Sequence, residues 1–353
     1  MDSDAQVKKR SLDDCYSSFY KTISETRSFN MGIAIIAVVL FHAASMFSVD
    51  ALQVFFARFG RWGVEVFFFL SGYGIFHALQ KNKSRWEFYT RRIVRIFPAA
   101  LVAGWSWYIL LPASASKLAC LFGLDQWYIR SILIFYFLSP YLVKLVFSKR
   151  AVLYIALVGL FCWGSASILK AHENVIIESI GGILTETIIW TCERITSFLI
   201  GLYMGAVGRN MVRRNMYIWL VGGAVCLLVA VALRYSCDFP VYLPNSFELL
   251  ASIYIFLGFS MPGVCYGLGL LRKWIPGFMR VFIDWLGGRS LELYLLHMLV
   301  FGVCKAFVNI PAIAFLVGCV LSVLASGILH GFLSRFVNPV LFEFCRTGKL
   351  SQK

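Results

Sequence analysis

Long continuous apolar blocks dominate this chain and limit what it can fold into. Most of the blocks approach the roughly 20 residues that an α-helix needs to cross a bilayer. With 59% hydrophobic and 14% charged residues, the chain lies outside the range of soluble globular domains. Continuous blocks favour helices over β-barrel strands, which alternate in segments of about ten residues. The sequence therefore predicts an all-α, polytopic transmembrane helix bundle.

About ten spans are expected, and the charges that flank them predict their orientation. If the spans alternate in direction, 25 of the 33 Lys and Arg residues fall on one side and 6 on the other. Because cytoplasmic loops carry the excess of basic residues, both termini are predicted to be cytoplasmic. The net charge of +15 then reflects topology, and no nucleic-acid partner is expected. The ten blocks are 29–49, 62–80, 97–112, 126–147, 151–169, 183–207, 216–233, 247–270, 289–308 and 311–333.

The chain is predicted to form one membrane domain between two short polar ends. Residues 1–28 form a polar cytoplasmic segment without a signal-peptide pattern, 29–335 a single transmembrane domain, and 336–353 a basic cytoplasmic tail. No internal repeat and no linker divides the domain. The 10 cysteines form no CxxC motif, so they are interpreted as packing thiols, and no metal site is expected.

Ionisable side chains inside apolar blocks are costly and point to function. His42 ends the run IAIIAVVLFH, about 20 Å along the first span at about 1.5 Å per residue. It is either a packed imidazole or a general base. Glu65 lies in GVEVFFFLSGYG and needs a cation or a proton, with Arg58, Arg61 or Arg194 as candidate partners. The alternative for Glu65 is an interfacial carboxylate.

A dense basic run precedes the third block. Arg91, Arg92 and Arg95 lie in EFYTRRIVRIFP (87–98), where their spacing puts them on one helix face, and Pro98 is expected to mark the start of the span. The run is either a basic loop that faces anionic lipid or a clamp for a phosphorylated cosubstrate.

A polar face also interrupts a late apolar block, GGRSLELYLLHMLV (287–300). Ser290, Tyr294 and His297 are four and three positions apart, which places them on one side of a helix. Inside a helix bundle such a face lines a cavity more often than it faces lipid.

Taken together, these blocks resemble the acyltransferase-3 family of integral-membrane acyltransferases. The blocks stand in the family's order: the run ending at His42, GVEVFFFLSGY, YTRRIVRIFP and GRSLELYLLHMLV, with weaker support from DQWYI and ERITSFLIGLYMG. Two positions depart from the family's pattern. Met31 stands where an Arg usually precedes the His by eleven positions, and Asp125 stands where a His is common. Arg27 is a candidate substitute for the missing arginine; the alternative is an altered or inactive site.

The resemblance implies a stand-alone membrane unit of the inner (cytoplasmic) membrane that moves an acyl group from cytoplasmic acyl-CoA to a hydroxyl. The acyl group is expected to be acetyl, from acetyl-CoA as cosubstrate. The acceptor is expected to be a cell-surface glycan or its lipid-linked precursor, with membrane lipid around the chain. Two alternatives stay open, a transporter or flippase for a lipid-linked saccharide and a non-catalytic member of the family.

The resemblance also implies roles for individual residues. His42 takes the proton of the acceptor hydroxyl or carries the acyl group itself. The expected roles are catalysis for His42 and Glu65, acyl-CoA binding for Arg91, Arg92 and Arg95, and lining of the acceptor cavity for Arg194, Ser290, Tyr294 and His297.

Overall fold

The predicted fold class is confirmed by a computed structural model of the chain. Helices make up 93% of the part that the structure describes, and no strand occurs in it. Within that part, nine helices are long and apolar enough to cross a membrane. The outermost residues of both predicted polar ends, 1–18 and 348–353, lie outside the description. The structure describes residues 19–47, 50–81, 84–111, 117–171, 182–208, 213–238 and 246–347.

The sixth predicted block, 183–207, forms α9 (Gly182–Val207), which is long enough to span a membrane but is not apolar enough to count among the nine. It carries Glu186, Glu193 and Arg194. From Ile195 to Gly205 its side chains are almost all buried, so α9 is enclosed by other helices. This part of α9 is therefore not a lipid-facing rod.

The predicted start of the third span was wrong. Helix α4 (Arg85–Leu110) begins about three turns before residue 97, because the Ser84 side chain caps it by accepting a hydrogen bond of 3.1 Å from the Glu87 backbone N–H. The basic run therefore forms the first turns of α4. Pro98 is buried inside the helix rather than at its start, which a bundle of neighbouring helices tolerates.

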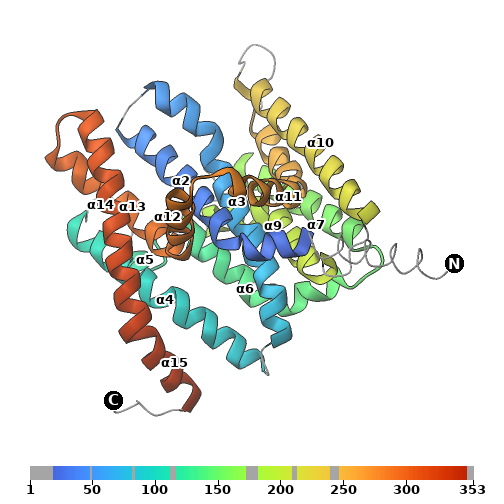
Figure 1. Cartoon of the computed structure of the whole chain (residues 1–353), viewed down its shortest axis with the longest axis horizontal. Helices are drawn as coiled ribbons and strands as arrows, with labels where there is room; N and C mark the ends of the chain where they lie inside the picture. Colours follow the sequence, from blue (N-terminus) through green and yellow to red (C-terminus); the bar gives the residue numbers. More distant parts are fainter. Residues whose placement is uncertain are drawn as a thin grey trace. The chain divides into compact units, whose positions relative to one another are not determined.

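The described chain divides into two compact units. The first takes its residues from Met1–Asn30, Glu65–Gln80 and Leu138–Gly277. In it α10 and α11 pack along each other, and α9 packs against α7 and α11 (Figure 1). Its helices are α7 (Ala151–Ala171), α9, α10 (Arg213–Asp238), α11 (Ser246–Leu271), the short η3 (Arg272–Trp274), the later part of α3 (Asp50–Lys81) and the end of α6 (Trp127–Val146).

Small residues allow α3 and α9 to touch backbone to backbone inside the first unit. A Cβ added at Gly72 would collide with the Phe198 carbonyl oxygen, and one added at Gly201 would collide with the Phe69 carbonyl oxygen. Such close approach is typical of helix pairs in membranes. It fixes the position of α9 against α3, and with it the charged residues of both helices.

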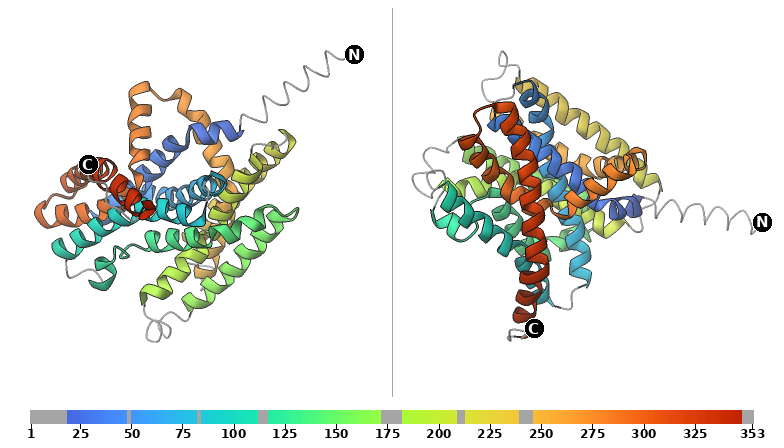
Figure 2. Two further views of the ribbon diagram at one scale, coloured as in Figure 1. Left: turned by 90° about the horizontal axis from the view of Figure 1, so that it is seen from below. Right: turned by 60° about the vertical axis from the view of Figure 1, so that its left-hand side comes forward.

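The second unit comprises Met31–Val64, Lys81–Phe137 and Phe278–Lys353, within the described ranges. Helices α13 and α14 form an antiparallel pair, and α4 packs on α13 and α15. After α14 the chain passes through one π-helical turn, η4 (Leu333–Val337), and continues as α15 in the same direction (Figure 2). The helices of this unit, with those already described included, are most of α2 (Arg27–Met46), α4, α5 (Lys117–Leu121), the start of α6, α12 (Gly277–Gly288), α13 (Ser290–Phe307), α14 (Pro311–Phe332) and α15 (Asn338–Thr347).

Candidate functional site

Two histidines meet in the second unit. His42 of α2 and His297 of α13 have ring centroids 5.2 Å apart, at an interplanar angle of 44°. His297 is 1% exposed and His42 is half-buried. His42 was predicted to be catalytic, as base or as acyl carrier, and His297 to line the cavity; the structure brings the two rings together.

The tautomer of His297 follows from its backbone contact. Its Nδ1 lies 3.1 Å from the Leu293 carbonyl oxygen, and a carbonyl only accepts, so Nδ1 carries the proton and donates. In the neutral ring Nε2 is then an acceptor. This buried atom has no hydrogen-bond partner in the described structure, so it is available to an incoming hydroxyl or water.

Aromatic rings enclose the histidine pair. Tyr294 lies one turn before His297, with its ring centroid 5.7 Å from the imidazole, and Tyr128 of α6 packs on Tyr294 at 4.7 Å. On the other side, Phe301 lies 5.7 Å from His297. The predicted polar face of α13 is thus lined by both polar and aromatic side chains. Tyr294 and His297 lie next to each other on it, and Ser290 lies buried at the start of the helix.

A turn between α5 and α6 places Tyr128. Gly123 adopts φ +64°, a left-handed conformation that favours glycine, and its N–H donates to the Cys120 carbonyl oxygen at 3.0 Å. After the turn, the Gln126 amide donates to the Leu295 carbonyl oxygen at 2.8 Å. The segment DQWYI, which gave only weak support from sequence, therefore anchors the start of α6 on α13.

Asp125 lies in the same turn, outside the membrane-spanning helices. Its backbone carbonyl accepts a hydrogen bond from Arg130 at 2.9 Å, while its Oδ1 is buried without a hydrogen-bond partner in the described structure. Burial raises the pKa of the Asp125 carboxyl above its ordinary value. The position that departs from the family's pattern is thus a half-buried carboxyl with a raised pKa.

The three predicted clamp arginines differ in their surroundings. Arg91 pairs with Glu87 at 2.8 Å, and both side chains are largely exposed. Arg92 lies over the ring of Tyr136 at 5.5 Å. Arg95 makes a two-point ion pair with Glu292 of α13, at 2.5 Å and 3.2 Å. In the first turns of α4, Arg91 and Arg92 therefore make contacts that an incoming ligand can replace. Arg95, in contrast, is bound to a buried carboxylate.

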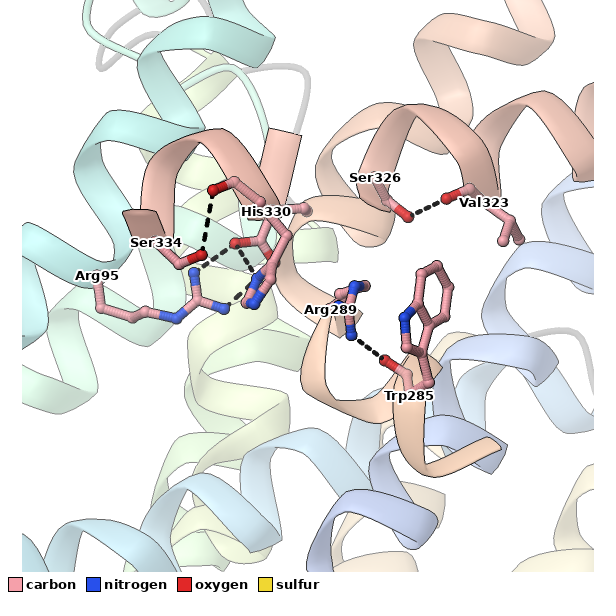
Figure 3. Close-up of polar contacts among 9 residues, drawn as sticks. Arg95, Trp285, Arg289, Val323, Ser326, His330 and Ser334 are labelled. Carbon is pink, nitrogen blue, oxygen red and sulfur yellow. Dashed lines mark hydrogen bonds and ion pairs between the residues drawn. The ribbon is translucent and has the colours of Figure 1, made fainter. Parts of the chain in front are cut away.

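Glu292 stood out in the sequence as an ionisable residue inside an apolar block, but no role at the site was predicted for it. It is fully buried in the first turn of α13 and also receives a hydrogen bond from His330 Nδ1 of α14 at 3.1 Å, so Arg95 and His330 converge on one carboxylate (Figure 3). Charge inside an apolar block was the only signal in the sequence, and it gave no indication of the partners.

A second charged cluster lies in the first unit. Arg194 Nε is 2.9 Å from Glu65 Oε1, and Glu65 Oε2 accepts a short hydrogen bond from Ser197. Of the three candidate partners for Glu65, Arg194 is confirmed, while the side chains of Arg58 and Arg61 lie outside the described part of the structure. Glu65 and Arg194 are 0% and 2% exposed, respectively. Glu65 is predicted to be catalytic, and the structure engages both of its carboxylate oxygens.

The cluster continues through Glu193, which pairs with Lys170 of α7 at 2.5 Å and with Arg194 at 3.3 Å. The Arg194 guanidinium also lies 3.7 Å from the ring centroid of Tyr254 on α11. The two carboxylates and the two cations of this cluster neutralise each other's charge, as buried charges require. Arg194 is predicted to line the acceptor cavity, and the structure shows it as the centre of a neutral ion network across α3, α7, α9 and α11.

Arg27, the candidate substitute for the missing arginine, lies on the same helix as His42. Both residues lie on the continuous helix α2, fifteen positions apart, which is about 22 Å of helical rise. Met31 is half-buried one turn after Arg27. That Arg27 substitutes for the missing arginine stays a prediction.

A cavity of about 520 Å³ opens between α4 and α5. It is lined by Trp105, Tyr108, Ile109, Leu118 and Leu121, and the Trp105 indole N–H is satisfied by the Leu121 carbonyl oxygen at 3.0 Å. The walls are thus apolar. Within the described ranges, no group of His, Cys, Asp and Glu is arranged to hold a metal ion.

Comparison with known proteins gives one match. The sequence profile of an acyltransferase domain, that of the acyltransferase-3 family, matches residues 32–331, which is nearly the whole chain. No curated protein and no solved structure matches the chain.

Proposed function

The chain belongs to the acyltransferase-3 family, and we propose that this multi-pass membrane protein transfers an acetyl group from cytoplasmic acetyl-CoA to a hydroxyl of a lipid-linked saccharide. One observation carries the proposal. The histidine pair and the basic turns of α4 are both fixed to α13, because Arg95 binds Glu292 and His42 contacts His297. Glu292 and His297 are five positions apart, about 7.5 Å of helical rise.

In this proposal the phosphates of acetyl-CoA bind at the first turns of α4. Arg91 and Arg92 supply forked donors that match phosphate geometry. The Arg91–Glu87 pair is exposed, so an incoming phosphate exchanges with Glu87 at little cost. Arg95 is the third predicted phosphate ligand, and its fork is held by Glu292. The thioester then reaches toward His42 along α13.

His42 acts on the acceptor hydroxyl, either as the base that removes its proton or as the carrier of the acetyl group. The open Nε2 of His297 adds an acceptor beside it, which supports binding of a hydroxyl next to the two rings. Glu65 stays a prediction as the second catalytic residue, with its orientation fixed by Arg194 and Ser197.

The apolar cavity between α4 and α5 favours a lipid-linked acceptor over a free glycan. Leu111, next to the end of α4, packs directly on Gly302 of α13, five positions beyond His297. The cavity thus opens near the level of the histidine pair, where the hydrocarbon chain of an acceptor would lie. Its volume is within the range of about 300–1,000 Å³ that is usual for ligand sites.

The proposal is tested by mass spectrometry of surface polysaccharide and of extracted lipid-linked saccharides, from cells with and without the gene. We expect the loss of one acetyl mass from both fractions when the gene is deleted, and its return when the gene is restored. Unchanged masses in both fractions contradict the proposal. Uptake of a saccharide into vesicles without dependence on acetyl-CoA would instead identify the transporter alternative.

A further inference from the structure

Glu292, the carboxylate of α13, has so far served only to tie α4 to α13, and no part in the reaction has been derived for it. Glu292 is 0% exposed, and three donors reach it from two other helices: Arg95 Nη1 and Nη2 from α4 and His330 Nδ1 from α14 (Figure 3). The two oxygens are fully engaged. A carboxylate held at three points in an apolar bundle fixes the elements that hold it.

A ligand anion can displace the carboxylate partner of Arg91 more easily than that of Arg95. The Arg91–Glu87 pair joins side chains that are 52% and 31% exposed on one helix, whereas the Arg95–Glu292 pair joins a 38% exposed cation to a carboxylate with no exposure. If a phosphate bound Arg95 in place of Glu292, the Glu292 carboxylate would stay buried with only His330 as a partner. Such an uncompensated charge is strongly disfavoured. The structure therefore commits Arg95 to Glu292.

The pair also sets the axial position of α13 against α4. At one end Arg95 binds Glu292, and at the other end Leu111 packs on Gly302. Between these two points α13 carries Tyr294 and His297. A change at Glu292 is thus transmitted along a rigid helix to the ring that contacts His42.

We propose that Glu292 is a positioning residue of the acyl-transfer site, that Arg95 is its counter-ion rather than a phosphate ligand, and that His330 completes the fixation. The inference rests on the proposed function, because it concerns the same histidine pair. It divides the predicted arginine clamp: Arg91 and Arg92 bind the cosubstrate, and Arg95 aligns the helix that carries His297.

The test compares single variants in the purified full-length protein in lipid nanodiscs. The variants are Glu292→Gln, Arg95→Ala, Arg95→Lys and Arg92→Ala, with Glu25→Gln as the matched control. Glu25 makes an exposed pair with Lys21 and lies outside the proposed site. Acetyl-CoA binding is measured by calorimetry, and kcat and KM by transfer of labelled acetyl to extracted lipid-linked saccharides.

We expect Glu292→Gln and Arg95→Ala each to lower kcat at least tenfold while the Kd for acetyl-CoA stays within twofold of wild type. Arg95→Lys should restore part of kcat, because it keeps the charge but loses the fork. Arg92→Ala should raise the Kd at least tenfold, and Glu25→Gln should change neither quantity. If Arg95→Ala raises the Kd as much as Arg92→Ala does, and Glu292→Gln leaves kcat unchanged, the inference is overturned.

A failure of the proposed function is distinguishable from a failure of this inference. If the wild-type protein neither binds acetyl-CoA nor transfers acetyl, the proposed function fails. The Arg95→Ala/Glu292→Gln double variant then decides the pairing by its melting temperature. Residues that act as one unit give a double variant no less stable than the worse single variant, whereas independent residues give additive losses. Additive losses overturn the inference.

Discussion

The imidazole of His297 is fixed by its own helix and faces the imidazole of His42. Its Nδ1 donates to the Leu293 carbonyl oxygen at 3.1 Å, and the centroids of the two rings are 5.2 Å apart. A neutral acceptor nitrogen is therefore held beside the predicted base. The proposed chemistry of the chain therefore involves residues of α2 and α13.

The first prediction concerns His297. A His297→Phe variant keeps an aromatic ring against Tyr294 but removes Nε2, so we expect acetyl transfer to fall by a factor of about 10²–10⁴, the usual contribution of a positioned acid or base. Cys304→Ser, on the same helix beyond the ring contacts, is the matched control and should keep at least half of the activity. Initial rates with labelled acetyl-CoA check this, and near wild-type rates for His297→Phe would refute a role for Nε2.

The second prediction concerns the ion network of the first unit. Glu65→Gln leaves the buried Arg194 without one of its two carboxylates, and breaking a buried pair from one side costs about 3–5 kcal/mol. We expect a clearly lower melting temperature for this variant. Glu25→Gln breaks an exposed pair, worth about 0–1 kcal/mol, and should change the melting temperature little.

The same variant separates structure from catalysis at Glu65. A Glu65→Gln protein that is purified below its melting temperature is expected to bind acetyl-CoA normally. If its transfer rate is also normal, Glu65 has no catalytic part, and the predicted role is withdrawn. An unchanged melting temperature would show that the network does not stabilise the unit.

The membrane spans were predictable from the sequence because each span is determined by the residues of its own segment. An apolar stretch of sufficient length is a helix wherever it lies in lipid, and nine of the ten blocks form helices that meet this criterion in the described structure. The start of α4 was not predictable from hydropathy, because Ser84 and Glu87 extend the helix beyond the apolar block. Capping, and not burial, sets that boundary.

The site was predictable only where its residues share one helix. Tyr294 and His297 were grouped correctly from their spacing, whereas the pairing of Arg95 with Glu292 joins positions 197 residues apart. No periodicity links such positions. The cost of a buried charge indicates that Glu292 needs a partner, but the choice between the available cations is made by helix packing.

The third prediction concerns Asp125 and pH. Its pKa is raised in the folded chain by burial, so the folded state binds its proton more tightly than the unfolded state. Stability from this group is present below the unfolded pKa, which is about 3.9, and is lost as the pH rises through the folded pKa. Asp125→Asn should remove this loss.

Melting temperatures at pH 4.5 and pH 7.5 test this prediction; the two buffers are chosen to lie above the unfolded carboxyl pKa of about 3.9. The wild type should lose more stability than Asp125→Asn between the two buffers, and the variant should be at least as stable as the wild type at pH 7.5. Equal losses in the two proteins would mean that Asp125 titrates alike in the folded and unfolded states.

The central claim is that His42 carries out acetyl transfer from acetyl-CoA, and one measurement tests it most directly. The purified wild-type protein and His42→Ala, each in nanodiscs, are given acetyl-CoA with a labelled acetyl group and extracted lipid-linked saccharides. The account predicts label in the saccharide with the wild type, at least a hundredfold less with His42→Ala, and the same Kd for acetyl-CoA in both. Undiminished labelling by His42→Ala would contradict it.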